Sequence, residues 1–265
     1  ASDVYKRQVG SRMIRSGDGR TNKYDVEAGN NTYDNAVIEN SKISEKNKIQ
    51  NNQSMLDDIM NSTQYPKQLK DLALKNEEAL EFVYDYPAEH VKEHTIDLTE
   101  EASMDSVPLF VQWDKRWGYE KYSGNFFAAS GCGPTTLSMV VVYLTHNRDA
   151  SPIAVAKYSK EAGYSVDGSG SSWTLISEGC MHYGVKAKAV ALDESRMKAE
   201  LDEGHPIVVN VGPGDFTDTG HFMVITGYDD EGFSINDPNS IEKSGKRWLF
   251  KNISSQIRAV WSMYV

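Results

Sequence analysis

The chain has 265 residues, 39% apolar and 10% aromatic, which is enough for one sizeable domain with additional segments and excludes a wholly disordered protein. Its 28 Lys and Arg against 38 Asp and Glu give a formal charge of −10, which argues against a protein that binds nucleic-acid phosphates. The longest apolar run, Met139 to Leu144, is far shorter than the roughly 20 residues that cross a bilayer, so no membrane span is expected.

The first part of the chain shows no hydrophobic period. Asp3 to Gln8 resembles the translation of a sequencing-library adaptor, so we expect residues 1–20 to be a non-native or unstructured leader and the true N-terminus to be missing. Residues 21–64 are rich in Asn, Gln, Ser and Lys without a sustained period, which is typical of a polar, flexible linker.

Residues 65–106 are predicted to form a short, acidic and helical preface to the main domain. Apolar residues recur there at near-helical spacing, which predicts one or two amphipathic helices ending near Pro87. These residues are Leu69, Leu72, Leu74, Leu80, Phe82 and Val83. Ten acidic residues and one basic residue, Lys92, lie between Glu77 and Asp105. This charge run is either a solvated connecting face or a segment that shields a basic partner or an active cleft.

Residues 107–265 hold all five tryptophans and form the main domain. Helices are predicted at Cys132–Leu144, Ser151–Ala162, Ser171–Tyr183 and Asp193–Asp202. Strands are predicted at Val107–Val111, Val185–Val190, Pro206–Val211, His221–Gly227, Gly232–Asn236, Arg247–Phe250 and Ala259–Val265, with a hairpin turn at Asp229–Gly232. Helices followed by an antiparallel sheet predict an α+β domain.

Cys132 lies between two glycines at the predicted start of a helix, in Gly131-Cys132-Gly133. Glycines let the backbone bend and approach a substrate carbonyl, and the positive end of a helix lowers the pKa of a thiol. These features favour a nucleophile, whereas the simpler alternative is a small buried packing residue.

His221 begins an apolar strand directly after a glycine-rich loop. A catalytic thiolate needs an imidazole from a remote part of the chain, although a half-buried structural histidine would look the same. Asp237 follows sixteen residues later, where the hairpin returns, and its carboxylate is placed to fix the imidazole tautomer. Asp237 also precedes Pro238, so a turn role can coexist with that one.

Together these motifs resemble the papain-fold cysteine peptidases of the bacteriocin-processing, double-glycine type, cysteine peptidase family 39, and in particular their stand-alone relatives in Gram-positive bacteria. The resemblance covers 107–265. It rests on Val107-Pro-Leu-Phe-Val-Gln112-Trp, Gly131-Cys-Gly-Pro-Thr-Thr, Gly168-Ser-Gly-Ser-Ser-Trp173, Tyr183-Gly-Val, Gly220-His-Phe-Met-Val-Ile-Thr-Gly-Tyr228 and Asn236-Asp-Pro. It implies a papain-like fold, with Cys132 as nucleophile, His221 as general base and acid, and Asp237 as its orienting partner.

One position departs from that family. Its leader peptidases carry an oxyanion-hole glutamine six residues before the cysteine, where this chain has Phe126. Gln112, twenty residues before Cys132, lies in the motif shared with the stand-alone relatives, and we assign it the role of oxyanion donor. A surface glutamine at a strand end is the alternative. No P-loop glycine pattern follows, so leader processing during export is not implied.

The sequence leaves three other functions open. His90-Val-Lys-Glu93-His94 fits the H-x-x-E-H pattern of a zinc protease, with two imidazoles on one helix face. A peptidoglycan amidase or endopeptidase would use the same cysteine and histidine. A catalytically silent module would retain the fold and bind a peptide in its cleft.

The remaining candidates have simpler roles. Cys180 is expected to be a packing thiol, and His146, His182 and His205 are expected to be solvated or capping residues. Of the tryptophans, Trp173 is the expected cleft wall. The resemblance implies a peptide or protein substrate, no cofactor and no metal. Together with the long polar linker, which suits a tether, it favours an extracytoplasmic or cell-surface location and allows association with the cell wall. We expect a monomer.

Overall fold

The computed structural model describes residues 31–265. The chain divides into two compact units, Ala1–Lys48 and Ile49–Val265. The leader expected at 1–20 and the first part of the expected linker, 21–30, lie outside the described residues. No helix among the described residues is both long and apolar enough to cross a membrane.

The structure differs from the expected flexible linker over Asn31–Asn61, which forms helix α1. This stretch contains no glycine or proline that would break a helix, and its polar residues lack an apolar stripe over most of its length. Near its C-terminal end, Met55, Leu56 and Ile59 fall on one helical face and join an apolar cluster. The sequence did not indicate this helix because most of the stretch has no periodic apolar residues.

The expected preface forms three short helices, α2 (Lys67–Lys75), α3 (Leu80–Tyr84) and α4 (Tyr86–Glu89), with a 3₁₀ turn at Glu77–Ala79. Pro87 lies in the first turn of α4 rather than at the end of a helix, where its missing N–H leaves no bond unmade. Their apolar faces share one cluster with Phe126 and Ala128 of the main domain. The preface is therefore packed onto the domain that follows it.

The main domain is built on a six-stranded antiparallel sheet with strand order β5-β10-β6-β7-β8-β9. Its strands are β5 (Lys186–Ala189), β6 (Ile207–Val211), β7 (His221–Asp229), β8 (Gly232–Asn236), β9 (Arg247–Trp248) and β10 (Ile257–Tyr264). Alternate residues face opposite sides: Val208 and Phe222 join one apolar cluster, and Val209 and Met223 join another. The sheet is thus buried on both faces around β6 and β7.

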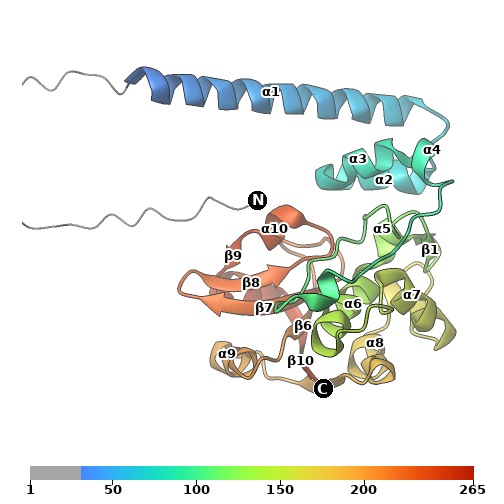
Figure 1. Ribbon diagram of the computed structural model, residues 1–265, viewed down its shortest axis with the longest axis vertical. Helices are drawn as coiled ribbons and strands as arrows, with labels where there is room; N and C mark the ends of the chain where they lie inside the picture. Colours follow the sequence, from blue (N-terminus) through green and yellow to red (C-terminus); the bar gives the residue numbers. More distant parts are fainter. Residues whose placement is uncertain (1–30) are drawn as a thin grey trace, which may run out of the picture. The chain divides into compact units, whose positions relative to one another are not determined.

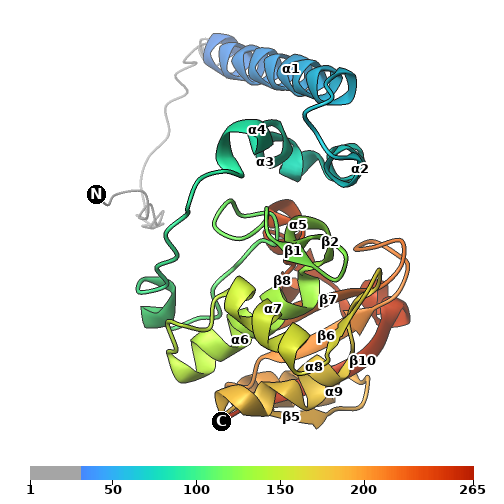
Figure 2. The ribbon, with the colours of Figure 1, turned by 90° about the vertical axis from the view of Figure 1, so that its right-hand side faces the viewer.

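Helices cover both faces of this sheet. Figures 1 and 2 show α6 (Cys132–Thr145), α7 (Pro152–Glu161) and α8 (Thr174–Ser177) together on one side, where they share an apolar cluster with Phe222. Helix α9 (Glu194–Asp202) packs against the other face through Met197. This confirms the expected α+β arrangement. Three further one-turn helices are α5 (Phe127–Ser130), α10 (Ile241–Ser244) and α11 (Phe250–Ile253).

The strand predicted at Val107–Val111 is absent, although this segment is largely buried. The side chain of Asn236, at the end of β8, donates to the carbonyls of Val107 and Pro108 at 3.0 and 3.1 Å. Pro108 has no N–H to contribute to a ladder. A side chain therefore anchors the segment where a neighbouring strand was expected.

The helix predicted at Ser171–Tyr183 is broken into α8 and a 3₁₀ segment, Gly179–Tyr183. Glu178 leaves the helical conformation, and Gly179 packs so closely that a Cβ there would lie 3.0 Å from the ring of Tyr164. The helix does end at Gly184, as expected, in the left-handed conformation. Two short hairpins were not predicted: β1 (Lys121–Tyr122) with β2 (Asn125–Phe126), and β3 (Ser165–Val166) with β4 (Gly170–Ser171).

Candidate active site

Cys132 is the first residue of α6, and Gly131 precedes it as the N-cap. Both flanking glycines are required by close packing: a Cβ on Gly131 would lie 2.6 Å from the Phe127 ring, and one on Gly133 would lie 2.6 Å from the Ser171 hydroxyl. The thiol thus sits at the positive end of a fourteen-residue helix whose start is packed tightly in place.

The thiol of Cys132 is partly exposed and faces the ring of His221. Burial acts to raise its pKa, but the hydrogen bond and positive charge of His221 act against burial, and so do backbone hydrogen bonds at Phe222 and Gly133. The pKa of the Cys132 thiol therefore lies below its usual value, as a nucleophilic cysteine requires.

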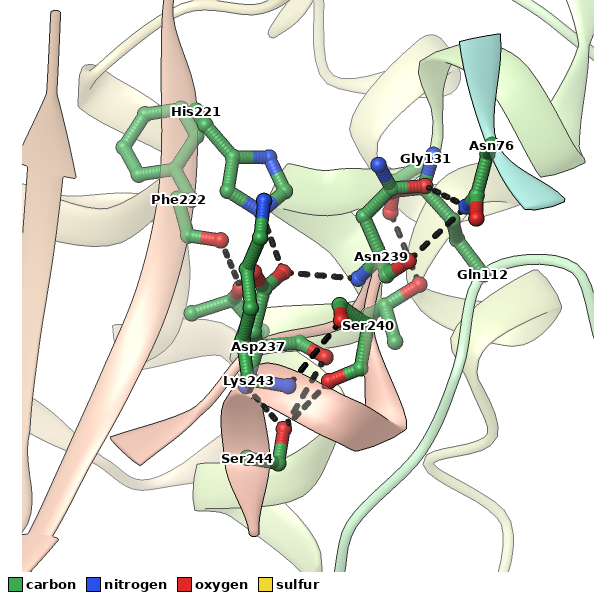
Figure 3. A network of polar contacts seen from close by, with 12 residues as sticks. Asn76, Gln112, Gly131, His221, Phe222, Asp237, Asn239, Ser240, Lys243 and Ser244 are labelled. Atoms are coloured by element: carbon green, nitrogen blue, oxygen red, sulfur yellow. Dashed lines mark hydrogen bonds and ion pairs between the residues drawn. The ribbon is translucent and has the colours of Figure 1, made fainter. Parts of the chain in front are cut away.

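His221 is the first residue of β7, and its ring is buried against Asp237. The ring Nε2 and the carboxylate Oδ1 are 2.7 Å apart (Figure 3). Burial alone would lower the pKa of His221, but the charge and hydrogen bond of Asp237, followed by those of Cys132, raise it to about 10. An imidazolium paired with a thiolate is the form that these shifts favour.

Asp237 lies directly after β8, in a turn closed by the hydrogen bond from the Ser240 N–H to the Asp237 carbonyl at 3.2 Å. Its carboxylate is fully buried, and Oδ1 accepts from both His221 and the backbone N–H of Asn239, the latter at 2.8 Å. Its backbone N–H donates to the hydroxyl of Ser244 at 2.9 Å. Asp237 is therefore both a turn residue and the partner of His221, as the sequence allowed.

Gln112 is buried beside the cleft rather than exposed at a strand end. Its Nε2 donates to the carbonyl of Ala128 at 2.7 Å, and its backbone N–H donates to the carbonyl of Pro238 at 2.7 Å. One amide hydrogen is thus used to fix the side chain, while the other has no acceptor among residues 31–265. Phe126, six residues before Cys132, is buried in the apolar cluster of the preface.

Two cavities meet at Cys132. One, of about 490 Å³, is lined by His221, Gln112 and residues of α2, among them Lys75. The other, of about 710 Å³, is lined by the glycine-rich segment Gly168–Ser171 and by Trp173. Trp173 is 47% exposed, which agrees with its expected place in the cleft wall. Together the cavities form one cleft that the thiol divides into a histidine half and a tryptophan half.

Sequence reasoning missed three residues around this cleft. Asn125 lines both halves of the cleft. It lies in a short hairpin that no sequence pattern indicated. Asn239 supplies the second hydrogen bond to Asp237, and its place after Asp-Pro was the only available sign. Asn76 of the preface also lines the histidine half, which no sequence pattern could have indicated.

The other chemical candidates lie elsewhere. Cys180 is fully buried, and burial raises the pKa of its thiol to about 11, which fits the expected packing role. The expected helix carrying His90 and His94 ends at Glu89, so the two imidazoles do not share a helical face. Each ring bonds locally instead, His90 to the Tyr86 carbonyl and His94 to the Glu89 carbonyl. No group of three or more candidate metal ligands occurs within residues 31–265.

The remaining histidines have the local roles expected of them. His146 caps the C-terminus of α6 and contacts the Ala102 carbonyl at 2.8 Å. His182 stacks on Tyr158, and His205 lies 3.4 Å from Glu200. None of them reaches the cleft.

Comparisons with known proteins find solved structures and a family with some similarity to this chain. Among solved structures, the peptidase domain of Streptococcus ComA, a bi-functional ABC transporter involved in a quorum-sensing pathway, is 19% identical with a TM-score of 0.43, over 60% of this chain and 96% of that one. A putative C39-like peptidase from Bacillus anthracis is 18% identical with a TM-score of 0.37, over 60% of this chain and 95% of that one. A comparison with curated proteins finds no match. The model of the Peptidase_C39 like family matches residues 104–265, which is more than half of the sequence, and the chain belongs to that family.

Proposed function

We propose that this protein is a cysteine peptidase that hydrolyses peptide bonds through Cys132, His221 and Asp237. The observation that carries the proposal is the buried 2.7 Å pair of His221 and Asp237 facing a thiol of lowered pKa at the start of α6. Membership of the Peptidase_C39 like family supports the same class of reaction. The remaining steps follow from the positions of these groups.

The thiolate of Cys132 attacks the carbonyl carbon of the scissile peptide bond, and the carbonyl π electrons move to oxygen. When this tetrahedral species collapses, the C–N bond breaks and the imidazolium of His221 gives its proton to the leaving amine. An acyl group then remains on Sγ. Neutral His221 takes a proton from water, whose oxygen attacks the thioester, and collapse restores the thiolate and imidazolium.

The oxyanion needs donors beside the attacked carbon. The first N–H groups of a helix have no partner within it, so the backbone N–H of Cys132 is oriented for this use. We assign the second donor to Gln112, because the hydrogen bond of Nε2 to Ala128 holds the amide in one orientation and leaves its other hydrogen available.

The direction of the substrate follows from the same chemistry. His221 must reach the leaving amine, so the residues after the scissile bond occupy the histidine half of the cleft, beside α2. The acyl portion stays on Cys132 and extends into the tryptophan half, along Gly168–Ser171. A peptide therefore crosses the start of α6 from one half to the other.

A peptide library incubated with the wild type, Cys132→Ala and His221→Ala tests the proposal. Hydrolysis by the wild type that is lost in both variants is the expected result. Equal rates in the wild type and His221→Ala would contradict the mechanism. Cleavage of purified cell-wall peptides but not of linear peptides would keep the mechanism and replace the substrate class, whereas peptide binding without turnover would favour the silent module.

A further inference from the structure

The carboxylate that orients His221 is carried by a turn, not by a strand. Strand β8 ends at Asn236, and the turn from Asp237 to Ser240 is closed by a single backbone hydrogen bond of 3.2 Å. Only Oδ1 of Asp237 is hydrogen-bonded: among residues 31–265, the buried Oδ2 has no partner. The direction of the carboxylate therefore depends on the two donors to Oδ1, which are His221 itself and the backbone N–H of Asn239.

The peptide units of this turn are held by donors from outside it. The backbone N–H of Gln112 donates to the carbonyl of Pro238 at 2.7 Å. The side chain of Asn76 donates through Nδ2 to the carbonyl of Asn239 at 2.9 Å and to its side-chain oxygen at 3.0 Å. The indole of Trp113 donates to the same carbonyl at 3.2 Å. Figure 3 shows Asn76 directed at Asn239, with Asp237 and His221 beyond it.

A second residue of the same segment holds the far end of the turn. The carboxylate of Glu78 accepts from the backbone N–H groups of Ile241 and Glu242 at 2.8 and 3.1 Å, and from the hydroxyl of Ser240. Negative charge at these N–H groups stabilises the start of α10. Asn76, which precedes the 3₁₀ turn after α2, and Glu78, which lies within it, thus both hold the segment that follows Asp237.

This part of the preface is itself rigidly placed. Leu72, Ala79 and Leu80 are buried in the cluster that also contains Phe126 and Ala128. Asn76 is fixed from the other side, because its Oδ1 accepts from the backbone N–H of Glu78 at 3.0 Å and caps the 3₁₀ turn. The amide of Asn76 therefore presents Nδ2 to Asn239 in one orientation.

We propose that Asn76 is a positioning residue for the catalytic site: through Asn239 it fixes the Asp237 carboxylate against His221. This rests on the proposed function, since it concerns the same three side chains. Asn76 precedes the stretch matched by the family model, residues 104–265, so the preface adds a part of the active site that the family domain does not contain. A peptide unit released at Asn239 would turn its N–H away from Oδ1 and weaken the hold of Asp237 on the imidazolium.

The test is the pH dependence of Cys132 alkylation by iodoacetamide in the full chain, with peptide mapping, for the wild type, Asn76→Ser and Asn52→Ser. Serine at 76 can still cap the 3₁₀ turn, but it is too short to reach Asn239. Asn52 also donates to this segment, to Glu77 at 2.8 Å, and does not contact the turn, which makes it the matched control. Thermal unfolding of each variant shows that it is folded.

Asn76→Ser is expected to shift the midpoint of rapid Cys132 labelling upward by about one pH unit, which lowers the rate in mild acid about tenfold. Asn52→Ser is expected to superimpose on the wild type. Alkylation needs no bound peptide, so a lost substrate contact at Asn76 cannot produce this shift. Equal profiles for Asn76→Ser and the wild type would overturn the positioning role while leaving the proposed function intact, and equal shifts in both variants would also overturn it. A wild type without a His221-dependent reactive thiol would overturn both proposals.

Discussion

His221 and Asp237 form a 2.7 Å ion pair whose side chains are only 7% and 0% exposed. Water screens such a pair little, so the charge and hydrogen bond of Asp237, together with those of Cys132, outweigh the effect of burial on the pKa of the imidazole. With Nε2 bonded to Asp237, the ring has its other nitrogen, Nδ1, left for the thiol of Cys132. The pair thus fixes both the charge and the orientation of the ring.

Replacing Asp237 with asparagine is expected to abolish this effect. Burial would then dominate, the pKa of His221 would fall, and the Cys132 thiol would return towards its ordinary value. Peptide hydrolysis at neutral pH should fall at least about 100-fold. The control is Asp229→Asn at the far end of β7, where the exposed carboxylate pairs with Arg247. An Asp237→Asn protein that is folded and retains wild-type turnover would contradict the role of Asp237.

The pH profile of kcat/KM should have two limbs of different origin. The active pair forms as the pH rises through the lowered pKa of Cys132, and it is lost as the pH rises through the pKa of His221, about 10. Activity should therefore extend through neutral pH and decline only in alkali. Rates measured across that range in the wild type and in Asp237→Asn test this, because the alkaline limb should move to lower pH in the variant. An alkaline limb that stays at the same pH in Asp237→Asn would show that it does not come from the deprotonation of His221.

Gln112→Leu separates oxyanion stabilisation from thiol activation. Hydrolysis should fall roughly 10²- to 10³-fold, because the tetrahedral oxyanion loses a donor. Alkylation of Cys132 forms no oxyanion, so its rate and pH dependence should remain those of the wild type. Parallel losses in both assays would show instead that Gln112 supports the fold of the site through Ala128 and Pro238.

The division of the cleft predicts two separable specificities. Lys75→Glu changes the wall of the histidine half, and Trp173→Ala changes the wall of the tryptophan half. The first should alter the ratio of rates between peptides with acidic and basic residues after the scissile bond, roughly two- to fivefold for an exposed charge. It should leave small amide substrates, which have nothing beyond that bond, unaffected. If Trp173→Ala, and not Lys75→Glu, altered the preference for residues after the scissile bond, the direction assigned to the peptide would be reversed.

The start of α6 should tolerate no side chain at Gly131. An alanine there would place Cβ 2.6 Å from the Phe127 ring and 2.7 Å from its carbonyl oxygen, and a backbone atom cannot move away cheaply. The free energy of unfolding in denaturant should fall by about 1–3 kcal/mol. Gly245→Ala is the control, because its nearest neighbour would lie at 3.5 Å. Equal stabilities of the two variants would contradict the packing argument.

The sheet and the meeting of Cys132, His221 and Asp237 were predictable because each carries a local signal. Nearly continuous apolar runs indicate strands buried on both faces, as in β6 and β7, and Cys132, His221 and Asp237 are residue types whose positions at element ends are unusual. Helix α1 was not predictable, since most of its sequence has no apolar stripe. The strand predicted at Val107–Val111 does not form. The side chain of Asn236 bonds to this segment where the apolar pattern implied the backbone of a neighbouring strand.

No sequence pattern could predict the contacts between segments that are distant along the chain. Asn76 and Asn239 are 163 positions apart, and nothing in either neighbourhood indicates that they meet. Their contact depends on the packing of α2 and α3 against Phe126, a property of the whole fold. The preface was therefore expected as a connection, and its contribution to the site became visible only in the structure.

The most direct test of the central claim is the rate of iodoacetamide labelling of Cys132 and Cys180 between about pH 5 and 9, in the wild type and in His221→Ala. Cys180 serves as the internal control, since burial raises the pKa of its thiol to about 11. Rapid labelling of Cys132 alone in mild acid, lost in His221→Ala, is the result that a thiolate–imidazolium pair predicts. Labelling of Cys132 that is slow in mild acid, or that is unchanged when His221 is removed, would contradict it.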